Sequence, residues 1–181
     1  MLNVTIPAAE YYDNKLNEFV NTKRQDLQLE HSLVSVSKWE AKWCKPFIGK
    51  SMMTAEETFD YIRCMSLTQN VDPMIFKNVP REVLNEVTKY IEAPMTATVL
   101  TDTSTSSKQQ REVITSELIY YWMIAHNIPF ECQKWHLNRL LTLIRVCNIK
   151  NSPPKKMSQK DIITRNKELN AQRRKALQTK G

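Results

Sequence analysis

The stretch of sequence that decides the fold is VITSELIYYWMIAHNIPFECQKWHLNRLLTLIRVCNI, residues 113–149. Its apolar residues recur at helical spacing on both sides of Asn127-Ile128-Pro129, which predicts two helices joined by a short turn. Both predicted helices are apolar over much of their circumference. We therefore expect them to pack against each other as a helical hairpin at the centre of the fold.

A helix, a turn and a helix also make up one class of DNA-binding motif, but these residues do not favour that function. The recognition helix of such a motif presents polar and basic side chains to base edges from its first turn. The corresponding segment here is Glu131-Cys132-Gln133-Lys134-Trp135, and leucine dominates the helix that follows. We interpret the hairpin as core.

Three further helical patterns precede the hairpin. One starts at Ser32 and ends before Pro46. The second starts at Thr54, which has Glu57 three residues later, the spacing of a capping box. The third follows Pro80, where apolar residues again recur every three and four positions.

The first thirty residues predict strands. Apolar and polar residues alternate over residues 2–6, as in a half-buried strand. Residues 18–20 and 26–30 predict a hairpin with its turn across 21–25. Such a small sheet is marginal alone, so we expect it to pack on the helices.

Together these patterns predict a mostly α (α+β) fold, with a small N-terminal β-hairpin or sheet packed on a helical bundle. We expect residues 1–149 to form one domain, interrupted by a Thr- and Ser-rich segment at about 95–110 that predicts an exposed loop. Residues 150–181 form a basic tail, in which 159–176 have helix-forming composition but few apolar residues. We expect this helix to be stable only when docked on a partner or on the rest of the chain.

Positive charge is concentrated in the tail. The 181 residues carry a formal net charge of +7, but residues 150–181 hold ten basic and two acidic side chains, leaving residues 1–149 at −1. A basic tail on a nearly neutral body predicts an anionic partner, either an acidic protein surface or nucleic acid. Nucleic acid is the less favoured of the two, because the tail has no aromatic residue for base stacking. The tail residues assigned to partner binding are Lys155, Lys156, Lys160, Arg165, Arg173, Arg174 and Lys175.

No pattern of catalytic or ligand-binding residues emerges. Glycine occurs only twice, which excludes phosphate-binding loops built on glycine spacing. Cys44, Cys64, Cys132 and Cys147 lack the paired spacing of zinc ligands and fit buried thiols in a reducing compartment. We expect a protein that is not an enzyme and that has no catalytic residues, no metal and no cofactor.

No segment of the sequence predicts membrane insertion. No apolar run approaches the roughly 18 residues that a transmembrane helix needs. The N-terminus, MLNVTIPAAEYYDNK, lacks the basic start and apolar stretch of a secretion signal. We therefore expect no membrane partner.

Four blocks of the sequence resemble a family of small proteins from long-tailed bacteriophages. The blocks are LQLEHSLVSVSKWEAKWCKPF (27–47), IEAPMTAT (91–98), SELIYYWMIAHNIPFECQKWHLNRLLTLIRVCN (116–148) and RNKELNAQRRKALQTKG (165–181). In these blocks the chain is similar to tail assembly chaperones, which are encoded near the tail-tube and tape-measure genes. The resemblance covers most of residues 1–180.

The resemblance implies a non-enzymatic chaperone in the host cell cytoplasm. Its partners would be the phage tape-measure protein, a long helical chain with exposed apolar stripes, and the tail-tube protein that later replaces the chaperone. A homo-oligomer of this chain is also compatible with the resemblance. The apolar residues assigned to this contact, each of which also fits a core position, are Trp39, Trp43, Phe47, Tyr120, Tyr121 and Trp122.

Two other functions remain open from the sequence. One is a structural protein of the virion, such as a head–tail connector or tail-completion subunit, whose tail contacts DNA or a neighbouring subunit. The other is a nucleic-acid-binding protein that acts through the basic tail. Binding to DNA that weakens steeply with salt would favour the second.

Overall fold

The structure is a computed structural model, which describes residues 1–13, 17–49, 53–77, 79–98, 113–152 and 159–177. The chain divides into two compact units, Met1–Cys147 and Asn148–Gly181. Helices predominate and four short strands lie at the N-terminus, so the predicted mostly helical α+β class is confirmed. Most of the segment predicted as a Thr- and Ser-rich loop lies outside the described residues.

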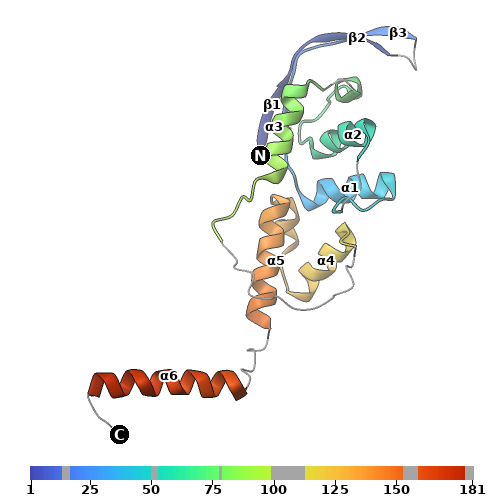
Figure 1. Ribbon diagram of the computed structural model, residues 1–181. Helices are drawn as coiled ribbons and strands as arrows, with labels where there is room; N and C mark the ends of the chain where they lie inside the picture. Colours follow the sequence, from blue (N-terminus) through green and yellow to red (C-terminus); the bar gives the residue numbers. More distant parts are fainter. Residues whose placement is uncertain (14–16, 50–52, 78, 99–112, 153–158, 178–181) are drawn as a thin grey trace. The chain divides into compact units, whose positions relative to one another are not determined.

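The helices occur where the sequence periodicity predicts them (Figure 1). Two short 3-10 helices, η1 and η2, lie between them. None of the helices in the described ranges is long and apolar enough to cross a bilayer. In chain order the helical elements are α1 (Leu33–Trp43), α2 (Ala55–Met65), η1 (Pro73–Lys77), α3 (Arg81–Glu92), α4 (Ser116–Ala125), η2 (Phe130–Lys134), α5 (Leu137–Asn151) and α6 (Gln159–Leu177).

The four strands form one long, bent hairpin (Figure 1). Strand β1 pairs antiparallel with β4, and β2 pairs antiparallel with β3. Ile6 faces Gln25 and Ala9 faces Thr22, so the register continues from one ladder to the next without a shift. The strands are β1 (Leu2–Ile6), β2 (Ala9–Asp13), β3 (Glu18–Thr22) and β4 (Gln25–Leu29).

The predicted pairing of residues 18–20 with 26–30 is wrong. β3 pairs with β2 instead, and Asn17, directly before β3, has a φ of 56°, a left-handed conformation that asparagine tolerates. The observed pairing of β1 with β4 places one alternating apolar row from each strand against the core. The buried members of these rows are Val4, Ile6, Leu27 and Leu29.

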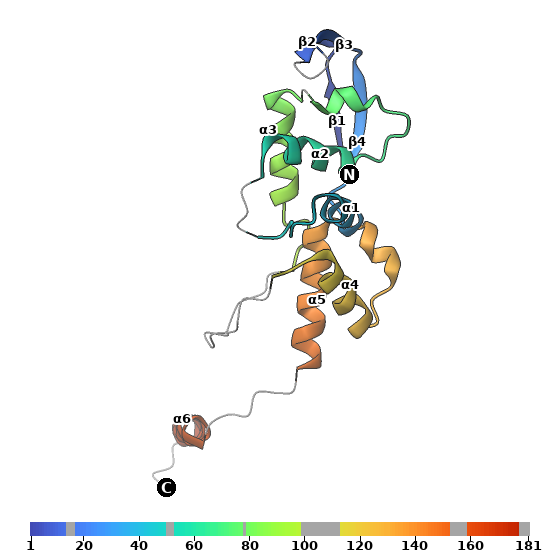
Figure 2. The same cartoon turned by 90° about the vertical axis from the view of Figure 1, so that its right-hand side faces the viewer.

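Helix α1 lies at the centre of the first unit. It is flanked by α2 on one side and by α4 and η2 on the other, as both views show (Figures 1 and 2). Its residues Leu33, Val36 and Trp39 recur at three-residue spacing and are almost completely buried. The sequence predicted that α4 and α5 pack against each other at the centre, but α1 holds the central position instead. Both α4 and α5 contribute buried side chains to the same core. Those side chains are Ile119, Met123, Leu137, Leu140 and Ile144.

The capping box predicted at the start of α2 is confirmed. The hydroxyl of Thr54 accepts a hydrogen bond from the N–H of Glu57 (3.2 Å), and Glu57 Oε2 accepts one from the N–H of Thr54 (2.8 Å). Glu57 Oε1 also accepts from Lys45 Nζ (2.5 Å). The bond from Lys45, with that from the Thr54 backbone, holds the pKa of Glu57 below its ordinary value.

The buried carboxylate of Glu40 connects α1 to two other segments. Its Oε1 accepts from the N–H of Phe47 (2.7 Å), and its Oε2 accepts from the N–H of Ser116 (2.7 Å) at the start of α4. A negative charge is favourable there because the first N–H groups of a helix lack helical partners and carry partial positive charge. A short antiparallel bridge between Ile48 and Ile114 lies alongside this connection.

Candidate partner-binding surfaces

Three of the six predicted apolar contact residues, Trp39, Trp43 and Phe47, lie mostly in the core. Trp39 is 2% exposed, and its Nε1–H donates to the carbonyl of Glu57 (2.9 Å). The ring of Phe47 packs on that of Trp39, with centroids 5.4 Å apart. Trp43 is half-buried, and its Nε1–H donates to Asp60 Oδ2 (2.9 Å). In this structure Trp39 therefore has almost no surface to offer a partner.

The other three predicted contact residues, Tyr120, Tyr121 and Trp122, are partly exposed. Tyr121 is 63% exposed, whereas Tyr120 and Trp122 are half-buried. The structure adds two exposed residues that the sequence analysis did not select, Ile124 at 60% and Phe130 at 52%. The Phe130 ring lies 6.4 Å from that of Tyr120. We refer to Tyr120, Tyr121, Ile124 and Phe130 as the α4 surface.

Helix α6 presents the basic tail. All its described side chains are exposed, including the predicted partner-binding residues Arg165, Arg173, Arg174 and Lys175. Lys155 and Lys156, by contrast, lie outside the described residues, as does the side chain of Lys160.

Three of the apolar residues of α6 lie along one side of the helix. Ile162, Leu169 and Ala176 are seven residues apart, close to two helical turns, and therefore share one face. Lys167 and Arg174 have the same spacing on a different face. Arg173 follows Ile162 by about three helical turns and so interrupts this sparse apolar side. Helix α6 is therefore an exposed basic helix with few apolar residues, a composition that suits an anionic partner surface.

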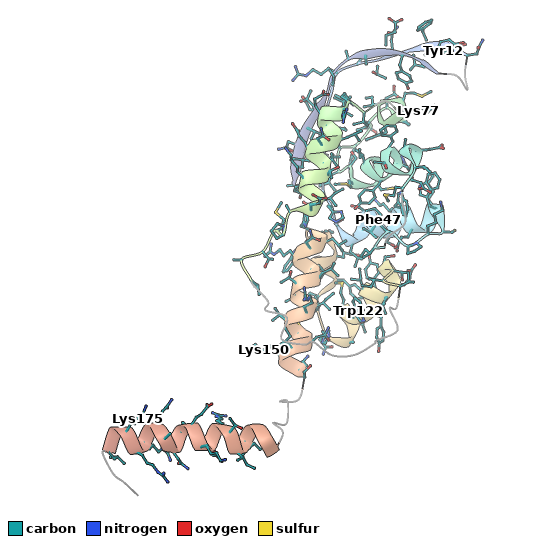
Figure 3. All side chains as sticks on the ribbon, in the orientation of Figure 1. Tyr12, Phe47, Lys77, Trp122, Lys150 and Lys175 are labelled. Atoms are coloured by element: carbon teal, nitrogen blue, oxygen red, sulfur yellow. The ribbon has the colours of Figure 1, made fainter. Side chains whose placement is uncertain are left out.

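A cleft of about 550 Å³, which the sequence analysis did not predict, opens in the first unit. It lies between the β2–β3 hairpin, α2, η1 and the end of α1. Tyr11 fixes the hairpin to η1, because its hydroxyl donates to the carbonyl of Met74 (3.0 Å). Aromatic side chains form much of the wall, and in Figure 3 Tyr12 lies on the hairpin next to η1, where Lys77 lies. The aromatic wall consists of Tyr11, Tyr12, Phe59 and Phe76.

Charged side chains surround a single buried carboxylate at this cleft. Asp60 Oδ1 accepts from Lys42 Nζ (2.7 Å) and from Arg63 Nε (2.8 Å), while its Oδ2 accepts from Trp43. Burial raises the pKa of Asp60, but these three hydrogen bonds outweigh it and hold the pKa below its ordinary value. Lys42 and Arg63 are about half exposed (50% and 46%), whereas Asp60 is 8% exposed.

A second polar cluster is buried away from this cleft. His31 Nδ1 is hydrogen-bonded to the hydroxyl of Tyr61, and the ring of His31 lies 5.1 Å from that of His136. Burial, together with His136, lowers the pKa of His31 to about 3. His136 Nε2–H donates to the carbonyl of Tyr90 (3.0 Å), and the Tyr90 hydroxyl donates to Glu30 (2.7 Å). These partners give both histidines a structural role in the core.

The described ranges contain no group of three or more His, Cys, Asp or Glu side chains arranged to hold a metal ion. Comparisons with protein-family models, with curated proteins and with solved structures found no match.

Proposed function

We propose that this protein is a non-enzymatic tail assembly chaperone of a long-tailed bacteriophage. In this function it binds the tape-measure protein and helps to recruit tail-tube subunits in the host cytoplasm. The phage role rests on the resemblance of the four sequence blocks quoted above.

The observation that supports a binding function is the exposed basic helix α6. A helix of 19 residues that buries none of its described side chains gains little stability from packing. Docking Ile162 and Leu169 into an apolar groove, with basic residues against acidic side chains around it, would supply that stability. The α4 surface, with Tyr121 and Ile124 exposed, offers a second apolar contact for a helical client.

Co-expression with the tape-measure protein of the same phage tests this proposal. The full chain should keep that client soluble and co-purify with it. A chain that ends at Ser152 should lose most of this effect, whereas Glu86→Gln, an exposed position on α3, should keep it. The proposal fails if the client is equally insoluble with and without the full chain.

Binding of nucleic acid is the second candidate, and the exposed basic residues of α6 favour it. Titration of the full chain into labelled duplex DNA at increasing salt distinguishes the two functions. DNA binding that weakens steeply with salt and is lost on truncation at Ser152 would support this candidate. A fixed copy number in purified particles would instead support a structural role in the virion.

A further inference from the structure

The cleft beside the β2–β3 hairpin has the size and lining of a binding site. Its volume of about 550 Å³ lies within the range typical of ligand pockets. Phe76 is buried at its base, Phe59 is half-buried, and Tyr12 is 45% exposed at its border. A wall of this kind accepts an aromatic or aliphatic side chain, because burial of apolar area on both sides is favourable.

The apolar surface continues from the cleft onto the hairpin. The rings of Tyr12 and Phe19 pack edge to face, with centroids 5.2 Å apart. Phe19 is 69% exposed. An occupant longer than a single side chain therefore has apolar surface to contact outside the cleft as well, which suits a polypeptide segment better than a small molecule.

The charges at the cleft determine which polypeptide it fits. Lys42 and Arg63 share one carboxylate, that of Asp60, so two half-exposed cations have one nearly buried anion between them. Lys77 adds a third cation to the lining, and Glu56 is its other carboxylate. The lining therefore has an excess of positive charge, which attracts an acidic segment and repels a basic one.

We propose that this cleft binds an acidic polypeptide segment that carries an aromatic or aliphatic anchor residue. The anchor enters between Phe59, Phe76 and Tyr12, and the flanking carboxylates lie near Lys42, Arg63 and Lys77. A basic helix such as α6 does not have the charge that this site requires. The inference goes beyond the proposed function, because the site includes no residue of α6 or of the α4 surface and its test needs no tape-measure protein.

Selection from a library of short random peptides, with the purified full chain as bait, tests the proposal. We expect the selected peptides to be enriched in Asp and Glu around a Trp, Phe or Leu. A selected peptide labelled with fluorescein, its Glu→Gln version and its anchor→Ala version are then titrated by fluorescence anisotropy. Both changed peptides should bind more weakly, and binding of the original peptide should weaken with salt.

Matched variants locate the binding to the cleft. Lys42→Glu with Lys77→Glu should weaken binding at least about tenfold, which corresponds to roughly 1.4 kcal/mol. Lys89→Glu with Lys134→Glu makes the same charge change at exposed positions outside the cleft and should leave binding unchanged. Tyr12→Ser removes apolar area without altering charge, and it should also weaken binding. Circular dichroism of each variant verifies folding, and Lys77→Glu alone serves if the Lys42 change unfolds the chain.

Three outcomes would overturn the proposal. The first is that no peptide is selected by the full chain. The second is that the selected peptides are neutral or basic. The third is that their affinity does not respond to Lys77→Glu or Tyr12→Ser in folded protein, which would place the binding elsewhere on the chain.

Discussion

Glu40 shows how one side chain can connect distant parts of the sequence. It is 7% exposed, and both of its oxygens accept backbone hydrogen bonds, from Phe47 and from Ser116. In Glu40→Gln one acceptor oxygen becomes an N–H donor that faces another donor. We expect this variant to lower the free energy of unfolding by about 2–3 kcal/mol, the cost of losing a buried bond to a charged group. Urea denaturation measures this change.

The control for this prediction is Glu86→Gln at an exposed position on α3. A substitution at such a surface position should change the free energy of unfolding by no more than about 0.5 kcal/mol. Equal effects of the two substitutions would show that the hydrogen bonds of Glu40 do not stabilise the fold.

His31 should make stability depend on pH. Burial lowers its pKa from 6.5 to about 3 in the folded chain, so below pH 6.5 the unfolded chain binds a proton that the folded chain does not. Stability should therefore be greatest above pH 6.5 and should fall toward pH 3, by up to about 1.4 kcal/mol per pH unit from this group. Urea midpoints measured across this range should decline less steeply in His31→Gln. The same slope in both proteins would contradict the assignment.

The aromatic residues of α1 and α4 show that the sequence does not predict how deeply a single side chain is buried. Trp39 and Trp43 look alike in the sequence, yet one is in the core and the other is half-buried beside Asp60. Helical spacing predicts which residues share a face of their own helix. It does not predict how much of that face the other elements cover, and for this reason Ile124 and Phe130 were missed.

At the scale of elements, α2 is the helix that its local sequence determines best. The reciprocal bonds between Thr54 and Glu57 satisfy two N–H groups that the helix itself leaves without partners. We expect Thr54→Ala to lower the free energy of unfolding by about 1 kcal/mol. Thermal or urea denaturation measures this loss. Thr88→Ala on α3, whose hydroxyl bonds to the carbonyl of Leu84 within the helix, is the matched control.

Thr88→Ala should change stability by less than about 0.5 kcal/mol, because a threonine that bonds back to its own helix contributes little. A cost for Thr54→Ala no greater than that of the control would mean that the capping box is not what stabilises the start of α2.

The sequence predicted the positions of two strands well, but it did not predict which strands pair. The alternation in residues 2–6 and in 26–30 correctly marked two strands, which are β1 and β4. A period of two residues says which side chains share a face, but not which strand is the neighbour. The strand β2 was missed because its two adjacent tyrosines, Tyr11 and Tyr12, break the apolar–polar alternation.

At the scale of the whole molecule, the division into two units predicts that they unfold separately. A chain that ends at Ser152 keeps every buried residue of the core. We expect its melting temperature to stay within about 2 °C of the full chain, a shift that corresponds to about 0.5–1 kcal/mol for a domain of this size. Calorimetry of both chains measures this, and a large decrease would show that the second unit stabilises the first.

The cleft could not be predicted from the sequence, because it depends on how the whole first unit folds. Its lining comes from β2, α1, α2 and η1, segments that are separate along the chain. No local motif marks it, because aromatic and basic residues at these positions are individually ordinary. Only the fold brings Tyr12, Lys42 and Lys77 to one place.

Glu40 and the Ile48–Ile114 bridge fix the beginning of α4, and this has a consequence for protein engineering. These contacts and the packing of Ile119 and Met123 in the core determine the position of α4, and not the number of residues that link it to α3. Extra residues placed between Thr98 and Val113 should therefore be accommodated with little change in stability, since lengthening a connection costs little once both ends are fixed. This makes the linking segment a suitable insertion site for an epitope tag or a fluorescent reporter.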